Sequence, residues 1–440
     1  MRFTTDEVAT ATGGEIFGRP TEVGGVSIDS RTVRPGDLFV PIVAERDGHD
    51  FIATAVKAGA AAYLTSGPIE AATAVLVSDT GVALTALGSH ARSRLPDRVV
   101  GVTGSVGKTS LKDMLASAAA TTWRTTVSVG SFNNELGVPL TLANAPDDRE
   151  LVVVEMGARG IGHISDLCRT ARPTVGVVTM VAGAHLEQFG SIEAVADAKS
   201  ELVASLPATG TAVLNMDDQR VAAMVTRTEA AVVGYGLDAG DVRAESVSVD
   251  ENLRARFTLR SPWGSAEVHL GVAGRHQVSN ALGAAATALA LGATVDAVAA
   301  GLAEARLSAM RMDVRVLADG LRIIDDTYNA NPTSMHAALR ALGETGAIRR
   351  FAVLGTMAEL GEGAADAHRE VFEAAHAAGL VVVTVAEPRY GAAADLAMDT
   401  PEAAVEWLRG QGLSGNDAVL VKASRSARLE RVVSGLTEDR

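Results

Sequence analysis

Short apolar runs alternate with segments of helical periodicity through most of this chain. The run at 99–102 predicts a buried strand, and apolar residues at helical spacing from 111 to 119 predict a helix directly behind it. Further apolar runs occur at 151–154, 175–181 and 212–214. Strands that alternate with helices indicate an α/β fold with a mostly parallel sheet.

Polar segments divide the pattern into three units. The proline-containing segment 94–98 marks the first boundary, and we predict units of 1–96, 97–307 and 308–440. The first unit is expected to hold a helix over 6–11, a helix from 47 to 57, and strands at 23–28, 38–43, 60–65 and 74–77. The third has apolar runs at 321–324, 351–354, 381–385 and 418–421. These runs predict a second, smaller, doubly wound unit of Rossmann-like type.

The composition narrows the functional class. The chain has 440 residues, 47% of them hydrophobic, and 39 basic against 53 acidic side chains give a net charge of −14. An acidic surface argues against nonspecific binding of nucleic acid or of anionic membranes. The single cysteine, Cys168, excludes an internal disulfide. The first residues lack an apolar signal core, and the weakly polar run 281–295 is too short to span a bilayer, so we expect a cytoplasmic protein.

A glycine-rich loop connects the strand at 99–102 to the helix behind it. Its residues are Thr103, Gly104, Ser105, Val106, Gly107, Lys108 and Thr109. Free N–H groups at a helix start, beside glycines that let a ligand approach the backbone, form an anion site. Lys108 could reach a terminal phosphate, and the Thr109 hydroxyl could bind magnesium. Val102 stands where this motif usually has its first glycine, and the alternative is a plain strand–helix turn with a surface lysine.

Polar residues follow two strands of the same unit. Glu155 ends the run at 151–154, and His185 follows the run at 175–181. Ligands of open α/β sheets collect beyond the carboxyl ends of the strands, so both side chains are candidate metal ligands near Lys108. The alternatives are a solvated strand end and a loop histidine without a role.

Lys199 lies on the apolar stripe of the helix predicted from 191 to 206. One interpretation is a lysine that extends to the edge of the stripe or pairs with a carboxylate. The other is a functional lysine beside the phosphate and metal site.

Two further polar segments could take part. Segment 274–280 leads into an alanine-rich helix from 281, where Asn280 could either cap the helix or bind the edge of a base. Segment 325–332 is too polar for a core and rich in turn-forming residues, so a surface loop is its alternative.

Taken together, these residues resemble the Mur ligases, ATP-dependent amide-forming enzymes of peptidoglycan precursor synthesis. The resemblance rests on segments spread through all three units: 29–31, 103–109, 131–134, 137–142, 155–157, the Lys199 helix, 325–332 and 354–361. The stretch Tyr328-Asn329-Ala330-Asn331-Pro332 resembles the members that join D-alanyl-D-alanine to UDP-N-acetylmuramoyl-tripeptide. The resemblance implies a UDP-substrate domain, a central P-loop ATPase domain and a C-terminal domain that binds the dipeptide, in a monomer.

The resemblance also implies a role for each motif. Lys108 and its loop would hold the ATP phosphates, Thr109 and Glu155 a first Mg²⁺, and His185 a second. Lys199 would be carbamoylated and join Lys108 and His185 as a catalytic residue, since carbamoylation turns a cation into an anion able to approach magnesium. Asn280 would contact adenine, Arg311 a phosphate, and Asp326 (or its neighbour Asp325) the ribose. The substrate residues would be Asp29, Ser30 and Arg31 on the uridine side, with Asn133, Asn134, Thr141, Tyr328, Asn329 and Asn331 around the peptides.

The implied reaction proceeds through an acyl phosphate, formed when the tripeptide carboxylate attacks the γ-phosphate of ATP. The chain departs from the family pattern at Gln277, Met310, Thr356 and Ala423, where Asn, Gly, Asp and Gly are usual. Two alternatives remain. The first is another ligase of this superfamily, such as folylpolyglutamate synthetase, and the second is a protein that senses ATP without ligation.

Overall fold

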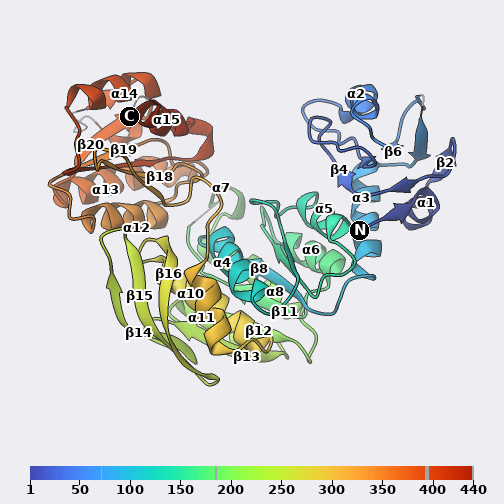
Figure 1. The fold of residues 1–440 in the computed structure, drawn as a ribbon, viewed down its shortest axis with the longest axis horizontal. Coiled ribbons are helices and arrows are strands. Elements are labelled where there is room, and N and C mark those ends of the chain that lie inside the picture. The colour runs from blue at the N-terminus through green and yellow to red at the C-terminus, as the bar shows by residue number, and fades with distance from the viewer. Residues whose placement is uncertain (71, 184–185, 392–395, 439–440) are drawn as a thin grey trace.

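The structure is a computed structural model that describes residues 1–70, 72–183, 186–391 and 396–438. Figure 1 shows three bodies: the N-terminal residues in blue and the C-terminal residues in orange and red lie on opposite sides, above a central body in cyan to yellow. Among the described residues, no helix is long and apolar enough to cross a membrane.

The first body contains a small sheet flanked by three α-helices of the described chain. Its strands are β1 (Phe3–Thr4), β2 (Glu15–Phe17), β3 (Glu22–Val23), β4 (Val26–Ser27), β5 (Leu38–Phe39), β6 (Ala62–Thr65) and β7 (Thr73–Leu76). Its α-helices are α1 (Thr5–Thr12), α2 (Ile52–Lys57) and α3 (Thr80–Arg92). The order β2-β7-β6-β5-β4 forms the sheet, and β1 pairs with β3.

The sequence located most of these elements but not all of their bounds. The helix expected over 6–11 is confirmed as α1, where Thr4 and Glu7 form a capping box. The strand expected over 23–28 is two short strands, β3 and β4, and the one expected over 38–43 ends at Phe39. The helix expected from 47 starts as a 3-10 turn, Gly48–Phe51, before α2. The lengths of the strands depend on their pairing across the sheet, and the hydrophobicity of a local segment does not predict this pairing.

The central body is built on one large sheet. Its strands are β8 (Val99–Thr103), β9 (Thr125–Val127), β10 (Leu151–Glu155), β11 (Val175–Val178), β12 (Thr211–Asn215), β13 (Ala231–Gly236), β14 (Val242–Val249), β15 (Arg254–Ser261) and β16 (Gly264–Ala273). Its helices are α4 (Lys108–Ala120), α5 (Gly137–Asn144), α6 (His163–Ala171), α7 (Leu186–Phe189), α8 (Ile192–Ala204), α9 (Gln219–Ala222), α10 (Gln277–Ala290) and α11 (Val295–Ala303). The strand order is β16-β15-β14-β13-β12-β11-β8-β10-β9.

This sheet is parallel from β9 to β14, as expected, but β15 and β16 extend it in antiparallel fashion. In β15, Ala255, Phe257 and Leu259 are buried while the residues between them face outward more. Such alternation is typical of an antiparallel strand with one covered face. The period of two is visible in the sequence and was missed because the helix–strand alternation was extended through it.

The parallel register brings several strand ends to one edge. Val178 of β11 lies opposite Thr103, and Glu155 of β10 lies opposite Val102. The loop after β8 and the carboxylate at the end of β10 therefore lie at the same edge of the sheet, where α4 begins.

The third body is a smaller sheet with helices on both faces. Its strands are β17 (Asp313–Val316), β18 (Arg322–Asp326), β19 (Arg349–Leu354), β20 (Val381–Val385), β21 (Ala397–Met398) and β22 (Asp417–Lys422). Its α-helices are α12 (Pro332–Gly343), α13 (Ala364–Ala377), α14 (Pro401–Gly410) and α15 (Glu430–Thr437). The order β17-β18-β22-β19-β20-β21 places β22 between β18 and β19. Asp325 and Asp326 belong to β18 itself, so the strand extends two residues beyond the predicted end.

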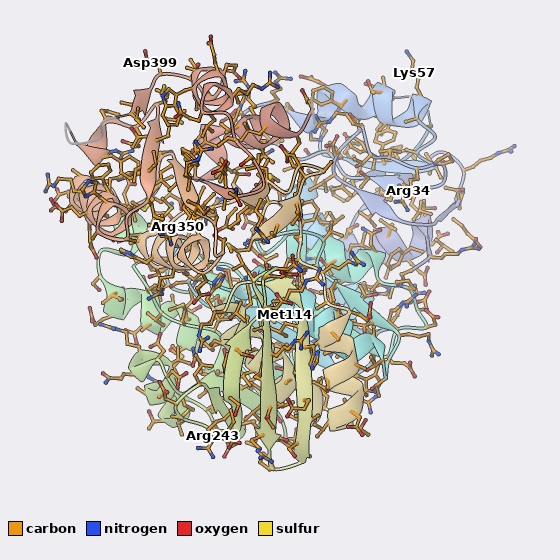
Figure 2. The ribbon with its side chains drawn as sticks, turned by 60° about the vertical axis from the view of Figure 1, so that its left-hand side comes forward. Arg34, Lys57, Met114, Arg243, Arg350 and Asp399 are labelled. Carbon is orange, nitrogen blue, oxygen red and sulfur yellow. The ribbon has the colours of Figure 1, made fainter. Side chains whose placement is uncertain are left out.

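Apolar contacts join the three bodies. One core cluster combines Leu84 and Leu87 of α3 with Val138 and Leu142 of α5. Another includes Leu253 and Ala273 of the central body together with β18 and α12. In Figure 2, Met114 of α4 lies near the middle of the view, whereas Lys57 lies at its top and Arg243 near its bottom.

Candidate active site

A cavity of about 880 Å³ lies between the three bodies. Ile28 of the first body, the start of α4 in the central body and residues of β18 and α12 in the third line it. Most of the predicted site residues are on its wall: Ser105, Val106, Gly107, Lys108, Thr109, Asn133, Asn134, Glu155, Lys199, Asn280, Arg311, Asp326, Tyr328, Asn329 and Asn331. The fold therefore brings together residues that are more than 200 positions apart.

The glycines of the loop after β8 are required by its geometry. Gly104 and Gly107 have φ angles of 139° and 87°, in the region that side chains disfavour. A Cβ at Gly104 would collide with the hydroxyl of Thr179, and one at Gly107 with Asn280. The Thr103 hydroxyl donates to the Met156 carbonyl at 2.8 Å, away from the cavity wall. The loop is therefore tightly held, and it has the strand–loop–helix form that the sequence predicted.

Lys108 occupies the first position of α4, directly after the αL glycine that precedes the helix. Its Nζ donates to the carbonyl oxygens of Gly104, at 2.7 Å, and Ser105, at 3.3 Å. Burial lowers the pKa of this ammonium, the nearby Glu155 opposes that shift, and Arg311 adds to it. A cation held on a buried helix N-terminus is suited to an anionic ligand.

Glu155 is held at the end of β10 between two polar side chains. Its side chain is buried; Oε2 accepts from the Thr109 hydroxyl at 2.8 Å and Oε1 from the Asn133 amide at 2.8 Å. In the described part of the chain, no group of three His, Cys, Asp or Glu side chains could hold a metal ion by itself. A carboxylate and a hydroxyl next to a glycine-rich loop at a helix start do suit Mg²⁺, which binds few protein ligands and completes its shell with phosphates and water.

Lys199 lies on the buried face of α8, as its position on the apolar stripe predicted. Its residue is 3% exposed, and its ammonium lies 5.9 Å from the centre of the Phe189 ring. Burial, reinforced by Lys108, lowers its pKa from 10.5 to about 7. A large fraction of this amine is therefore neutral at pH 7. His185, the other predicted metal ligand near this helix, lies outside the described residues.

Asn280 and Gln277 lie in the first turn of α10, so segment 277–280 begins the helix that was expected from 281. The Asn280 amide donates to Gln277 Oε1 at 2.8 Å, and the Gln277 amide lies 3.1 Å from His276 Nε2. Burial lowers the pKa of His276 to about 4, so the ring is neutral near pH 7. Gln277, where the family usually has Asn, fixes the amide of Asn280 next to Gly107.

Arg311 and Tyr328 form a stacked pair on the cavity wall. The guanidinium carbon lies 4.2 Å from the centre of the tyrosine ring, and the tyrosine hydroxyl is hydrogen-bonded to the Ser131 hydroxyl. Met310, where the family usually has Gly, has a φ of 62°. The left-handed conformation that glycine would favour is thus kept here by a methionine.

The two neighbouring aspartates of β18 face different surroundings. Asp326 lines the cavity and accepts from Lys422 Nζ at 2.6 Å. Asp325 accepts from the Thr327 hydroxyl at 2.6 Å and lies 3.7 Å from Arg315, and burial raises its pKa. Of the two residues that the sequence left open, it is therefore Asp326 that lines the cavity.

Several of the predicted peptide and uridine residues have structural partners. Asn331 caps α12 through Ser334, and Asn134 Oδ1 accepts from the Gly137 amide at 2.9 Å. The Thr141 hydroxyl donates to the Gly137 carbonyl at 2.8 Å, and Thr141 is not among the described residues that line the cavity. Asp29 and Arg31 form an exposed ion pair of 2.6 Å just beyond the lining residue Ile28, next to Ser30. Their roles stay predictions.

The sequence analysis missed residues that hold this site together. Lys422 is a buried lysine at the end of β22 that also donates to the Asn329 carbonyl at 2.8 Å. Lys112 is a buried lysine one turn after Lys108. A lysine three residues before Leu115 lies on the apolar stripe of α4, the same signal that singled out Lys199.

Comparison with known proteins decides the family. Three family models match in chain order: "Mur ligase family, catalytic domain" over residues 22–96, "Mur ligase middle domain" over 102–288, and "Mur ligase, glutamate ligase domain" over 310–425. The chain is 42% identical to the UDP-N-acetylmuramoyl-tripeptide--D-alanyl-D-alanine ligase of Mycobacterium tuberculosis H37Rv, with 94% of this chain and 92% of that protein covered. This chain belongs to the Mur ligase family.

Further relatives and solved structures also belong to the Mur ligase family. The enzyme of the same name from Escherichia coli K12 is 36% identical, with 99% of this chain and 98% of that protein covered. Among solved structures, MurF from Acinetobacter baumannii superimposes with a TM-score of 0.90 at 31% identity, covering 100% of this chain and 99% of that one. MurF from Thermotoga maritima in complex with ADP superimposes with a TM-score of 0.83 at 31% identity, covering 94% of this chain and 97% of that one. The predicted family and three-part α/β architecture are confirmed.

Proposed function

We propose that this Mur ligase joins D-alanyl-D-alanine to UDP-N-acetylmuramoyl-tripeptide, with conversion of ATP to ADP and phosphate. Curated relatives that are 36–42% identical to it have this activity in their names, and they match it over nearly their whole length. The observation on which the proposal rests most is one cavity that combines Lys108 and Glu155 of the central body with Arg311 and Asp326 of the third.

The side chains on the wall suit binding of ATP. Lys108, at the start of α4, would neutralise the terminal phosphates, and Arg311 would approach them from the other wall. Asn280 would accept a hydrogen bond from the base, and Asp326 would bind the ribose. The ADP complex of the Thermotoga maritima MurF supports a nucleotide site in this fold.

Amide formation needs an activated carboxylate, because oxide is a poor leaving group. The tripeptide carboxylate attacks the γ-phosphorus of ATP, the bond to the β-phosphate oxygen breaks, and ADP leaves. The amine of D-alanyl-D-alanine then attacks the acyl carbon, loses a proton, and inorganic phosphate leaves. The chain contributes positioning, electrostatic stabilisation and exclusion of water between its bodies.

Thr109 and Glu155 would hold a Mg²⁺ ion, and His185 a second. When bound, the ions would offset charge on the phosphoryl group. The buried amine of Lys199 would react with carbon dioxide to give a carbamate and a proton. Its lowered pKa supports this, since only the neutral amine is a nucleophile.

We further propose domain boundaries near residues 96 and 307, a monomeric state and a cytoplasmic location. The first family model ends at 96 and the second begins at 102, on either side of the first boundary, and the third begins at 310, close to the second boundary.

The test is mass spectrometry of the products formed from purified protein, ATP, Mg²⁺, UDP-N-acetylmuramoyl-tripeptide and D-alanyl-D-alanine. The expected product is the UDP-linked pentapeptide, with one ADP per amide. Omission of either peptide substrate should abolish turnover. Slow ADP formation that is independent of both peptide substrates would instead indicate an ATP sensor. Ligation of glutamate to a folate would indicate a different ligase of the superfamily.

A further inference from the structure

Lys112 and Asp113 form a buried ion pair on α4 that the proposed chemistry does not use. Lys112 is 1% exposed, and its Nζ donates to the carbonyls of Ser128 at 2.7 Å and Gly130 at 2.8 Å and lies 3.0 Å from Asp113 Oδ1. A buried charge is tolerated when it is paired and hydrogen-bonded. Lys112 meets both conditions.

The second oxygen of Asp113 reaches a distant part of the chain. Oδ2 accepts from the backbone N–H of Ser308 at 2.7 Å and from its hydroxyl at 2.8 Å. Ser308 lies between α11 and β17, in the segment that connects the central body to the third. Helix α4 thus holds both the phosphate-binding loop and this connection.

Asp113 and Lys112 each bond a residue that is close in the chain to the Arg311–Tyr328 stack or to its partner Ser131. Ser308 precedes Arg311 by three residues, and Gly130 precedes Ser131, whose hydroxyl bonds the Tyr328 hydroxyl. Arg311 Nε is buried and has no hydrogen-bond partner among the described residues. The course of the connecting segment and the tyrosine ring therefore determine where the guanidinium lies.

The connecting segment has an unfavourable backbone. Met310 and Met312 have φ angles of 62° and 51°. Non-glycine residues in this region cost free energy and persist only where the surroundings fix them. The two hydrogen bonds to Asp113 lie just before the strained residues, and the Tyr328 N–H, which donates to the Met310 carbonyl at 3.1 Å, holds them from the other side.

We propose that Asp113, paired with Lys112, is a positioning residue that fixes Arg311 relative to the phosphate-binding start of α4. Asp113 does not touch the nucleotide; it acts through Ser308 and Arg311. The inference rests on the proposed role of Arg311 at the ATP phosphates. It predicts that loss of the Asp113–Ser308 contact weakens ATP binding only while Arg311 is present.

The experiment is a double-mutant cycle with the full chain, read out as the Kd for ATP with Mg²⁺ by calorimetry. Asp113→Ala and Arg311→Ala should each weaken ATP binding by about tenfold, since loss of a hydrogen bond to a charged group costs that order of free energy. The double variant should bind no more weakly than Arg311→Ala alone. Asp296→Ala, at an exposed aspartate on α11, is the matched control and should bind as the parent does.

Additive losses in the cycle, or no loss in Asp113→Ala, would overturn the proposal, because a general structural defect does not depend on Arg311. Ser308→Ala gives a second cycle in case Asp113→Ala does not fold. Ser308→Ala removes the hydrogen bond from the Ser308 hydroxyl to Asp113 and keeps the one from the backbone N–H. We expect ATP to bind about threefold more weakly, and this difference should disappear in the Arg311→Ala background. Because ATP binding needs neither peptide, failure of the ligation assay would refute the proposed function without deciding this test.

Discussion

Two polar segments on the wall of the cavity are held in place by different means. Segment 103–109 is fixed largely within its own body, by left-handed glycines and by the bonds of Lys108 to Gly104 and Ser105. Segment 325–331 depends on remote partners. Lys422 binds Asp326 from a strand 96 residues away, and Ser131 binds Tyr328 across the boundary between two bodies.

The difference shows which kind of site a sequence can reveal. A loop whose geometry follows from glycines and a helix start carries its chemistry in a short stretch of residues. A segment whose side chains are oriented by distant groups shows only that it is polar. The following predictions test whether the first segment governs chemistry and the second governs binding.

The largest effect is expected at Lys108. Lys108→Ala should lower ligation by about a thousandfold or more, because charge developing on the phosphoryl group loses its buried cation. Quantifying the pentapeptide by chromatography measures this. Lys57→Ala removes an exposed lysine and should change nothing; comparable activity in the two variants would contradict the role of Lys108.

The next effect is expected at Lys199. Lys199→Ala should lower ligation by about a hundredfold, in line with the loss of one preorganised charged group. In the parent protein, ¹³C NMR with labelled bicarbonate should show a carbamate that disappears as pH falls below about 7, since the amine then becomes protonated. A signal that persists in Lys199→Ala would place the carbamate elsewhere.

The same group gives a stability prediction with a definite sign. The folded chain releases the Lys199 proton near pH 7, whereas the unfolded chain keeps it to about 10.5. The unfolded state therefore binds more protons between these values, and the contribution of Lys199 to stability increases with pH across this range. In bicarbonate-free buffer, Lys199→Met should flatten this part of the curve of unfolding free energy against pH.

A matched pair separates the two aspartates of β18. Asp326→Asn should raise the KM for ATP about tenfold, because a charged acceptor on the cavity wall is lost and Lys422 loses its carboxylate partner. Asp325→Asn should leave the KM for ATP unchanged, since the Asp325 side chain is hydrogen-bonded to Thr327 and does not line the cavity. Steady-state kinetics of both variants decides the point, and the reverse order would assign the ribose to Asp325.

The smallest effect is expected at the contact between Tyr328 and Ser131. Tyr328→Phe keeps the ring under Arg311 and removes only the hydroxyl, so kcat/KM should fall about threefold. Ser131→Ala should cause a similar loss, and the double variant should be no worse than either single one. Independent losses that multiply would mean that the two hydroxyls serve different groups.

The sequence by itself determined the local parts of this protein. Apolar periodicity located α4 and most parallel strands, the glycines and helix start of segment 103–109 predicted its strand–loop–helix form, and the stripe position of Lys199 marked it as buried. These features depend on residues that are close in the chain, so period and spacing are enough to recognise them. The antiparallel strands β15 and β16 were missed although their alternation was visible.

Only the tertiary structure decided which side chains meet. It placed Asp326 and not Asp325 on the cavity wall, joined Ser131 to Tyr328, and tied Ser308 to Asp113. Each of these contacts joins segments that are far apart in the chain, and one residue of shift along a strand reverses the face of a side chain. Strand register and the packing of the three bodies set that geometry, and neither can be predicted from a single short segment of the sequence.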